Sequence, residues 1–142
     1  MSVSPTQRAL AHARAQGWHA VVVERWNEHV RIRQDLWGVF DLLVLDEAPG
    51  VLGVQVCAGA SHAHRAAKVR AVIAGVAPAN ASETARRTAV ARSAALMHWQ
   101  RSGNRIEVWS FTKKGSRGKR KTWDLRYELL EVPFSVPIHL ET

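Results

Sequence analysis

Two apolar runs on either side of a Pro-Gly turn constrain the fold of this chain more than any other feature. The runs are VFDLLVLD (39–46) and VLGVQVC (51–57), and EAPG lies between them. Apolar, β-branched runs that flank such a turn are typical of a β-hairpin. Each run contains one polar side chain within its apolar stretch, Asp41 in the first and Gln55 in the second. An ionised Asp in such surroundings is costly unless it is paired, hydrogen-bonded or metal-bound, so Asp41 requires an explanation.

The register of this hairpin decides whether Asp41 and Gln55 can share a site, because side chains alternate between the two faces of a strand. If the five residues 46–50 form the loop, Leu45 pairs with Val51, and Asp41 falls opposite Gln55 on the same face. A four-residue loop without a bulge sends the two side chains to opposite faces. The sequence leaves both registers open.

Helices and further strands surround the hairpin in an α/β order. Ser4, Ser61 and Ser82 stand at N-cap positions, and a glycine follows the end of each helical pattern. Polar residues 27–38 indicate a loop, and 131–142, with two prolines, has no clear pattern. The predicted elements are helix 5–16, strand 18–26, the hairpin, helices 62–74 and 83–102, and strands 105–111 and 121–130.

Length and composition predict a single domain over residues 1–142, because 142 residues with 46% apolar content suit one core. The sequence contains neither an apolar run long enough for a membrane span nor the apolar segment of a secretory signal. A lone cysteine, Cys57, excludes an internal disulfide and a thiolate metal cage, and is expected in the core. We therefore expect a cytoplasmic protein without a membrane partner.

The charge of the chain favours a polyanionic partner. The net charge is +8, and Arg accounts for most of the basic residues; its planar guanidinium suits phosphate oxygens. The densest cluster is KKGSRGKRK (113–121), which is either a solvated hairpin tip or a phosphate-binding segment. The candidate nucleic-acid-binding residues in this cluster are Lys113, Lys114, Arg117, Lys119, Arg120 and Lys121.

The element order resembles the core of the PD-(D/E)XK nuclease superfamily. That core is an αβββαβ unit with an Asp on its second strand and an acid-x-Lys motif on its third. Here RQDLWGVFDLLVLD followed by VLGVQVC carries the resemblance, which covers roughly residues 5–111. The chain looks most like small phage and bacterial members related to Holliday-junction resolvases and VRR-NUC domains. The resemblance implies a restriction-endonuclease-like fold, with a mixed central sheet flanked by helices.

The resemblance implies a catalytic role for Asp41, as the metal-binding aspartate, and for Gln55, at the acidic position. Cys57 stands where the family has its lysine. That lysine normally orients the attacking water or stabilises charge on the phosphate. Lys68, on the following helix, is the candidate replacement, and Arg65, one turn earlier, is its substitute and a further candidate nucleic-acid contact. A solvated helical face is the alternative for both. A second departure is the lack of a glutamate in the first helix.

A divalent ion would be the cofactor of such a site. Mg²⁺ or Mn²⁺ would use the carboxylate of Asp41, the amide oxygen of Gln55 and the carbonyl of Val56, because these hard ions prefer oxygen ligands. Asp35 and Glu24 could add the missing negative charge, or could be surface ion-pair partners. A carboxylate at the end of a strand, held by Arg33 or by a backbone amide, is the alternative for Asp41.

These observations predict a nucleic-acid-binding protein that acts as a metal-dependent phosphodiesterase, with DNA preferred over RNA as its partner. Trp37, just before Asp41, could stack on a base or sugar, or could serve packing alone. Two other readings stay open. A catalytically inactive binding module on the same fold would explain Cys57, and an accessory protein could direct its basic surface to an acidic protein. A homodimer also stays open.

Overall fold

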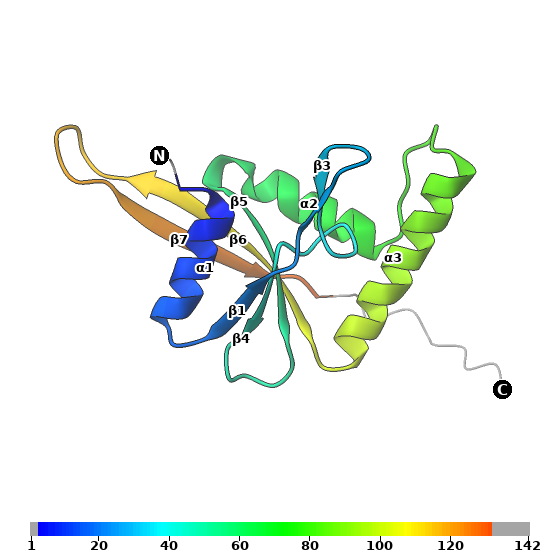
Figure 1. Ribbon diagram of the computed structural model, residues 1–142, viewed down its shortest axis with the longest axis horizontal. Coiled ribbons are helices and arrows are strands. Elements are labelled where there is room, and N and C mark those ends of the chain that lie inside the picture. Colours follow the sequence, from blue (N-terminus) through cyan, green and yellow to red (C-terminus); the bar gives the residue numbers. More distant parts are fainter. Residues whose placement is uncertain (1–2, 132–142) are drawn as a thin grey trace.

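The computed structural model describes residues 3–131 (Figure 1), and the C-terminal segment 132–142 lies outside them. Within the described residues, no helix is long and apolar enough to cross a membrane. The helices are α1 (Pro5–Ala15), α2 (His62–Ile73), preceded by the 3-10 turn η1 (Gly59–Ser61), and α3 (Glu83–Arg101). The strands are β1 (His19–Val22), β2 (Arg25–Asn27), β3 (Ile32–Gln34), β4 (Leu42–Leu45), β5 (Leu52–Ala58), β6 (Arg105–Lys114) and β7 (Thr122–Leu129).

One five-stranded sheet in the order β1-β4-β5-β6-β7 organises the chain, and β2 and β3 form a separate two-stranded hairpin. The pairs β1/β4, β4/β5 and β6/β7 are antiparallel, whereas β5 and β6 are parallel. A parallel pair needs a crossover connection, which α2 and α3 provide. The predicted α/β class, with a mixed sheet flanked by helices, is confirmed.

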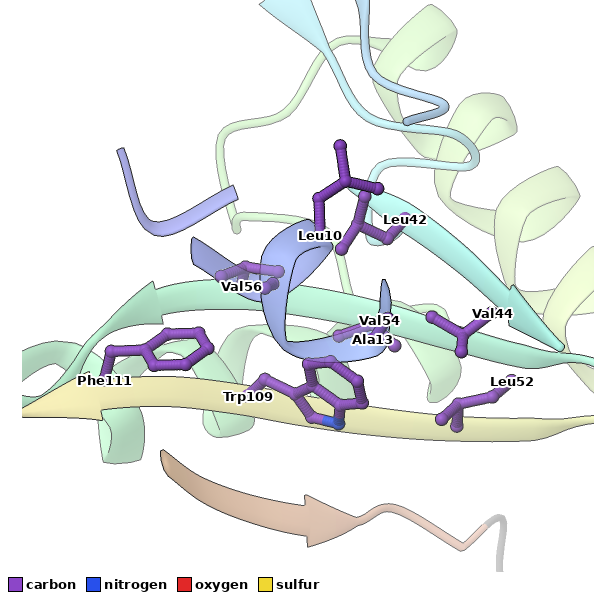
Figure 2. Packing of buried hydrophobic residues seen from close by; sticks show 10 residues of the cluster. Leu10, Ala13, Leu42, Val44, Leu52, Val54, Val56, Trp109 and Phe111 are labelled. Atoms are coloured by element: carbon purple, nitrogen blue, oxygen red, sulfur yellow. The ribbon is translucent and has the colours of Figure 1, made fainter. Parts of the chain in front are cut away.

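Side-chain alternation along β4 and β5 gives the sheet two buried faces. Leu42 and Val44 point toward Leu10 and Ala13 of α1, as Figure 2 shows. The opposite face of the sheet packs against α2 and α3, and its apolar cluster includes Cys57. The expected core position of Cys57 is confirmed. The polar side chains of Asp41 and Gln55 lie in register with this second face.

The β2–β3 hairpin was not predicted. The predicted strand 18–26 is divided into β1 and β2, and the predicted loop 27–38 contains β3. The side chain of Asn27 closes the turn by accepting hydrogen bonds from the backbone N–H groups of His29 and Val30. Most residues of the hairpin are exposed, so the sequence lacks the alternation of apolar and polar residues that reveals a half-buried strand.

The β4–β5 register is the one that a five-residue loop produces. Leu42 pairs with Val54 and Val44 with Leu52, which places Asp41 opposite Gln55. The loop is fastened to the start of β6, because the carboxylate of Asp46 binds the guanidinium of Arg105 at 2.5 and 2.9 Å. Of the two registers that the sequence leaves open, the structure therefore has the one that places Asp41 and Gln55 on the same face.

Gly50 ends this loop in a left-handed conformation with φ of +81°, and a Cβ there would lie 2.0 Å from the carbonyl oxygen of Gly103. We expect Gly50→Ala to lower the free energy of unfolding by about 1 to 2 kcal/mol through backbone strain and by about 1 to 3 kcal/mol more through the clash. Gly17→Ala is the matched control, because Gly17 also has φ of +81° but nothing within 4 Å of its Cβ position. Urea denaturation measures the free energy of unfolding of both variants. Equal losses for the two variants would contradict the tight contact.

Candidate functional site

Asp41 accepts two hydrogen bonds on one carboxylate oxygen at the start of β4. The side-chain Nε2 of Gln55 donates to Oδ2 at 2.6 Å, and the backbone N–H of Val56 donates to the same atom at 2.7 Å. The backbone of Asp41 is paired on both sides, since Val23 donates to its carbonyl and its N–H donates to Val54. Asp41 is 5% exposed and Gln55 is 2% exposed. The carboxylate is therefore held rigidly in a nearly dry position.

Two further carboxylates lie beside Asp41. One carboxylate oxygen each from Glu24, Asp35 and Asp41 lie within 4.8 Å of one another. Backbone pairing between neighbouring strands brings the three residues together. Extending the β2–β3 register places Glu24 opposite Asp35, and extending the Leu36–Phe40 bridge places Asp35 opposite Asp41. Glu24 and Asp35, the two additional ligands that the sequence offers, thus join Asp41 in one acidic cluster, Glu24–Asp35–Asp41.

Burial raises the pKa of Asp41 to about 8, and a hydrogen bond with the Asp35 side chain and the negative charges of Asp35 and Glu24 act in the same direction. The hydrogen bond from Val56 opposes the shift. With its pKa at about 8, Asp41 is mostly protonated at neutral pH when no cation is bound. The expected alternative contact with Arg33 is not made, because Arg33 pairs with Glu24 at 2.9 Å. The other alternative, a backbone amide, is present as Val56.

The donor set fits a hard divalent cation. Every candidate ligand is an oxygen, and the side-chain Oε1 of Gln55 is buried without a hydrogen-bond partner among the described residues. The amide of Gln55 meets Asp41 through its Nε2, so Oε1 carries the cost of a buried acceptor without a partner. Turning the amide over would present Oε1 to a cation held by the carboxylates. Val56 enters the site through its N–H group, and the ligand role of its carbonyl stays a prediction.

The surroundings of Cys57, the position at which the sequence resemblance implies a lysine, are apolar. Cys57 is two residues after Gln55 on β5, on the same face, and burial raises the pKa of its thiol, an effect that the guanidinium of Arg65 opposes. Arg65 is half-buried, whereas Lys68 is exposed. The positive charge that acts on Cys57 therefore comes from Arg65. A catalytic role for Lys68 stays a prediction.

The basic segment forms the tip of the long β6–β7 hairpin, hereafter the basic arm (residues 113–121), which projects beyond α1 in Figure 1. All of its residues are exposed. The ammonium of Lys114 pairs with Asp124 at 2.6 Å, and that of Lys121 donates to the carbonyl of Gly115 at 2.8 Å. The acidic cluster lies beside β1 and β4, whereas the arm joins β6 and β7, so the sheet order separates them.

Trp37 lies in the turn between β3 and β4. Its ring packs edge-on against Phe40 and Trp99, with centroids 6.1 and 5.8 Å away. About a third of its surface is exposed. The structure gives Trp37 a packing role, and a contact with nucleic acid stays a prediction.

A buried polar network on the α2 side of the sheet was not expected. The Nδ1 atom of His62 lies 2.6 Å from the hydroxyl of Ser110, and its Nε2 atom lies 3.2 Å from Glu128, which also pairs with Arg70. His62 and Ser110 are almost fully buried, so the network holds α2 against β6 and β7. These residues are far apart in the sequence, and no pattern links them.

The raised pKa of Asp41 predicts a pH-dependent cost to folding in the metal-free protein. The pKa of Asp41 is about 8 in the folded protein, and its ordinary value is 3.8. The contribution of Asp41 to the free energy of unfolding is therefore fully present below about pH 4 and is lost as the pH rises toward 8. The free energy of unfolding then falls by at most about 1.4 kcal/mol per pH unit over this range. Asp41→Asn should remove this slope and stabilise the chain near pH 8, as measured by urea denaturation in EDTA.

Asp46, at the other end of β4, is the matched control. The hydrogen bond from Arg105 lowers the pKa of Asp46, so its contribution is present above the ordinary pKa and is lost as the pH falls. Asp46→Asn should destabilise the chain at neutral pH and leave the slope between pH 4 and 8 in place. A wild-type slope in Asp41→Asn would contradict the assignment.

Comparison with known proteins does not assign the chain to a family: no family model matches it, and neither a curated protein nor a solved structure matches it.

Proposed function

We propose that this protein binds nucleic acid and hydrolyses phosphodiester bonds with the help of a divalent cation. The observation that carries the proposal is the acidic cluster Glu24–Asp35–Asp41, which lies against the amide of Gln55 with its unpartnered Oε1. Apart from the inserted β2–β3 hairpin and the additional helix α3, the order of α1, β1, β4, β5, α2 and the parallel strand β6 is compatible with the αβββαβ order that the sequence resemblance implies. The resemblance to junction resolvases favours DNA over RNA.

The three carboxylates and Gln55 would hold Mg²⁺ or Mn²⁺. When bound, such an ion polarises a phosphate oxygen and lowers the pKa of a water molecule, which makes the water a nucleophile at neutral pH. Asp35 and Glu24 supply the negative charge that Gln55, as a neutral amide, does not. The proton of Asp41 must leave before a cation binds to its carboxylate, so binding is coupled to pH.

Arg65 and the basic arm would meet the phosphates. Arg65, on α2, lies close enough to Cys57 for its positive charge to lower the pKa of the thiol. A guanidinium there can stabilise negative charge but is a poor proton donor. The exposed Lys and Arg residues of the arm can neutralise phosphates outside the site. The net charge of +8 supports attraction to a polyanion.

A non-catalytic binding module is the second candidate, and one observation favours it. Cys57 occupies the lysine position, and burial raises the pKa of its thiol, so it supplies neither a positive charge nor a ready thiolate. If Arg65 cannot substitute for the lysine, the cluster could bind a cation without efficient cleavage. The two candidates therefore differ in turnover and agree in nucleic-acid binding.

Cleavage of DNA should require Mn²⁺ or Mg²⁺, and EDTA should abolish it. Asp41→Asn should lower the rate by about 100-fold or more, since loss of one group that stabilises transition-state charge costs about that much, while binding in EDTA persists. Gln55→Glu should preserve or raise activity, because it adds a charged ligand. Glu83→Gln, on the exposed start of α3, is the control.

Calorimetric titration with Mn²⁺ separates the two candidates. Mn²⁺ binding that Asp41→Asn removes, together with undetectable cleavage, would establish the binding module. Cleavage that survives both EDTA and Asp41→Asn would contradict the proposed site altogether.

The basic arm should contribute to the salt dependence of binding. Each phosphate contact adds about 0.9 to the slope of log affinity against log salt, so replacing both Arg117 and Arg120 with Gln should lower the slope by about two. Replacing Arg86 and Arg101 of α3, which are also exposed, removes equal charge and should leave the slope nearly unchanged. Fluorescence anisotropy over a range of NaCl concentrations measures both. Identical slopes for the two double variants would exclude the arm from the binding surface.

A further inference from the structure

The β2–β3 hairpin forms a pocket beside the acidic cluster. Figure 1 shows the hairpin as an excursion that leaves the sheet after β1 and returns at β4. A pocket of about 300 Å³, partly open to solvent, is lined by Val22, Glu24, Trp26 and Arg33. Glu24 also belongs to the acidic cluster. The pocket is therefore a space next to the candidate cation ligands.

Trp26 and Arg33 present one mixed aromatic and cationic wall to this pocket. They are direct partners across the β2–β3 pair, so both side chains lie on the same face of the hairpin. Trp26 is 57% exposed. An indole in a pocket with an open face is a stacking surface for a planar group, since every nucleobase has a π-face.

Arg33 bridges the pocket and the cluster. Its Nη1 lies 2.9 Å from Oε1 of Glu24, yet the Arg33 side chain is 71% exposed and that of Glu24 is mostly buried. The exposed part of the guanidinium is free to meet a phosphate while the pair with Glu24 orients it. A cation bound by the cluster would also compete for the charge of Glu24.

We propose that this pocket receives one unpaired nucleotide, with its base stacked on Trp26 and its phosphate at Arg33, directly beside Glu24–Asp35–Asp41. The volume is at the lower end of the range for small-ligand pockets, about 300 to 1,000 Å³, which suits one nucleotide. A base inside a duplex has no free face for an indole. This inference rests on the proposed function and narrows its substrate class to nucleic acids with unpaired nucleotides, namely single strands, overhangs, flaps or loops.

Binding in EDTA tests the pocket separately from cleavage. The probes are a fluorescent single-stranded oligothymidylate and a blunt duplex. Trp26→Ala should weaken single-strand binding by about tenfold, the scale of one base-on-aromatic stack, and should leave duplex binding unchanged. Trp26→Tyr should retain most of the affinity, because it keeps an aromatic face.

Ile32 provides the matched apolar control. It pairs with Asn27, one position along the hairpin from Trp26, so its side chain lies on the opposite face. It is 52% exposed, and Ile32→Ala should not change the affinity for either probe. Far-ultraviolet circular dichroism confirms that each variant is folded.

The phosphate contact has a test of its own. Arg33→Gln should lower the salt slope of single-strand binding by about 0.7, the value for one contact to a single strand. Arg25→Gln removes the same charge from the other face of the hairpin, where Arg25 pairs with Gln34, and should leave the slope unchanged.

The outcomes separate this inference from the proposed function. Selective loss of single-strand affinity in Trp26→Ala, with rescue by Trp26→Tyr, supports the pocket whether or not Mn²⁺ produces cleavage. Wild-type affinity in Trp26→Ala, or an equal loss in Ile32→Ala or on the duplex, overturns the pocket and leaves the proposed function standing. Failure of the wild-type protein to bind either probe overturns both.

Discussion

The hydrogen bonds that Asp41 accepts from Gln55 and Val56 depend on the pairing of β4 with β5, and the candidate site depends on these bonds. They hold one carboxylate oxygen at 2.6 and 2.7 Å from its donors at a buried position. The β5 backbone fixes the N–H of Val56, and the buried side chain of Gln55 supplies the other donor, so the carboxylate is held away from water. The sheet thus fixes Asp41, and the β2–β3 hairpin brings Glu24 and Asp35 to it.

The acidic cluster opposes the stability of the fold. Three carboxylates within 4.8 Å of one another repel when ionised, and burial adds a desolvation cost that raises the pKa of Asp41. The unpartnered Oε1 of Gln55 adds a further cost. Such local costs are common where a site is arranged for a ligand rather than for stability. A cation would offset the repulsion among the three carboxylates, which is the physical reason for proposing a metal site there.

Cys57 and Arg65 are the residues on which the two proposed functions differ, because the proposed nuclease would have a lysine at the position of Cys57. Cys57 lies in the apolar cluster between the sheet and α2, where a lysine would have to bury its ammonium or extend past its neighbours. Arg65 reaches the same region from α2, with its charge acting on the thiol. A guanidinium keeps its charge at any physiological pH, so it can stabilise an anion but does not transfer a proton readily. This difference separates the two candidate functions.

The sequence by itself determined the class of fold and the central hairpin, because apolar periodicity, caps and glycines act locally. Ser4 and Ser82 cap α1 and α3 as expected, whereas Ser61 makes no side-chain cap because η1 precedes α2. The resemblance implied that Asp41 and Gln55 are partners. The nuclease function itself stays a proposal, since no pattern in the chain establishes a reaction.

Only the tertiary structure decided the β4–β5 register, the acidic cluster and the pocket at Trp26. The register depends on how the loop ending at Gly50 packs against Gly103, a contact between residues far apart in sequence. Glu24 and Asp35 meet Asp41 through the β2–β3 pair, whose exposed residues give no periodic signal. Local preferences specify helices, turns and strands, but the alignment of strands depends on long-range contacts, and a shift of one residue sends every side chain to the other face.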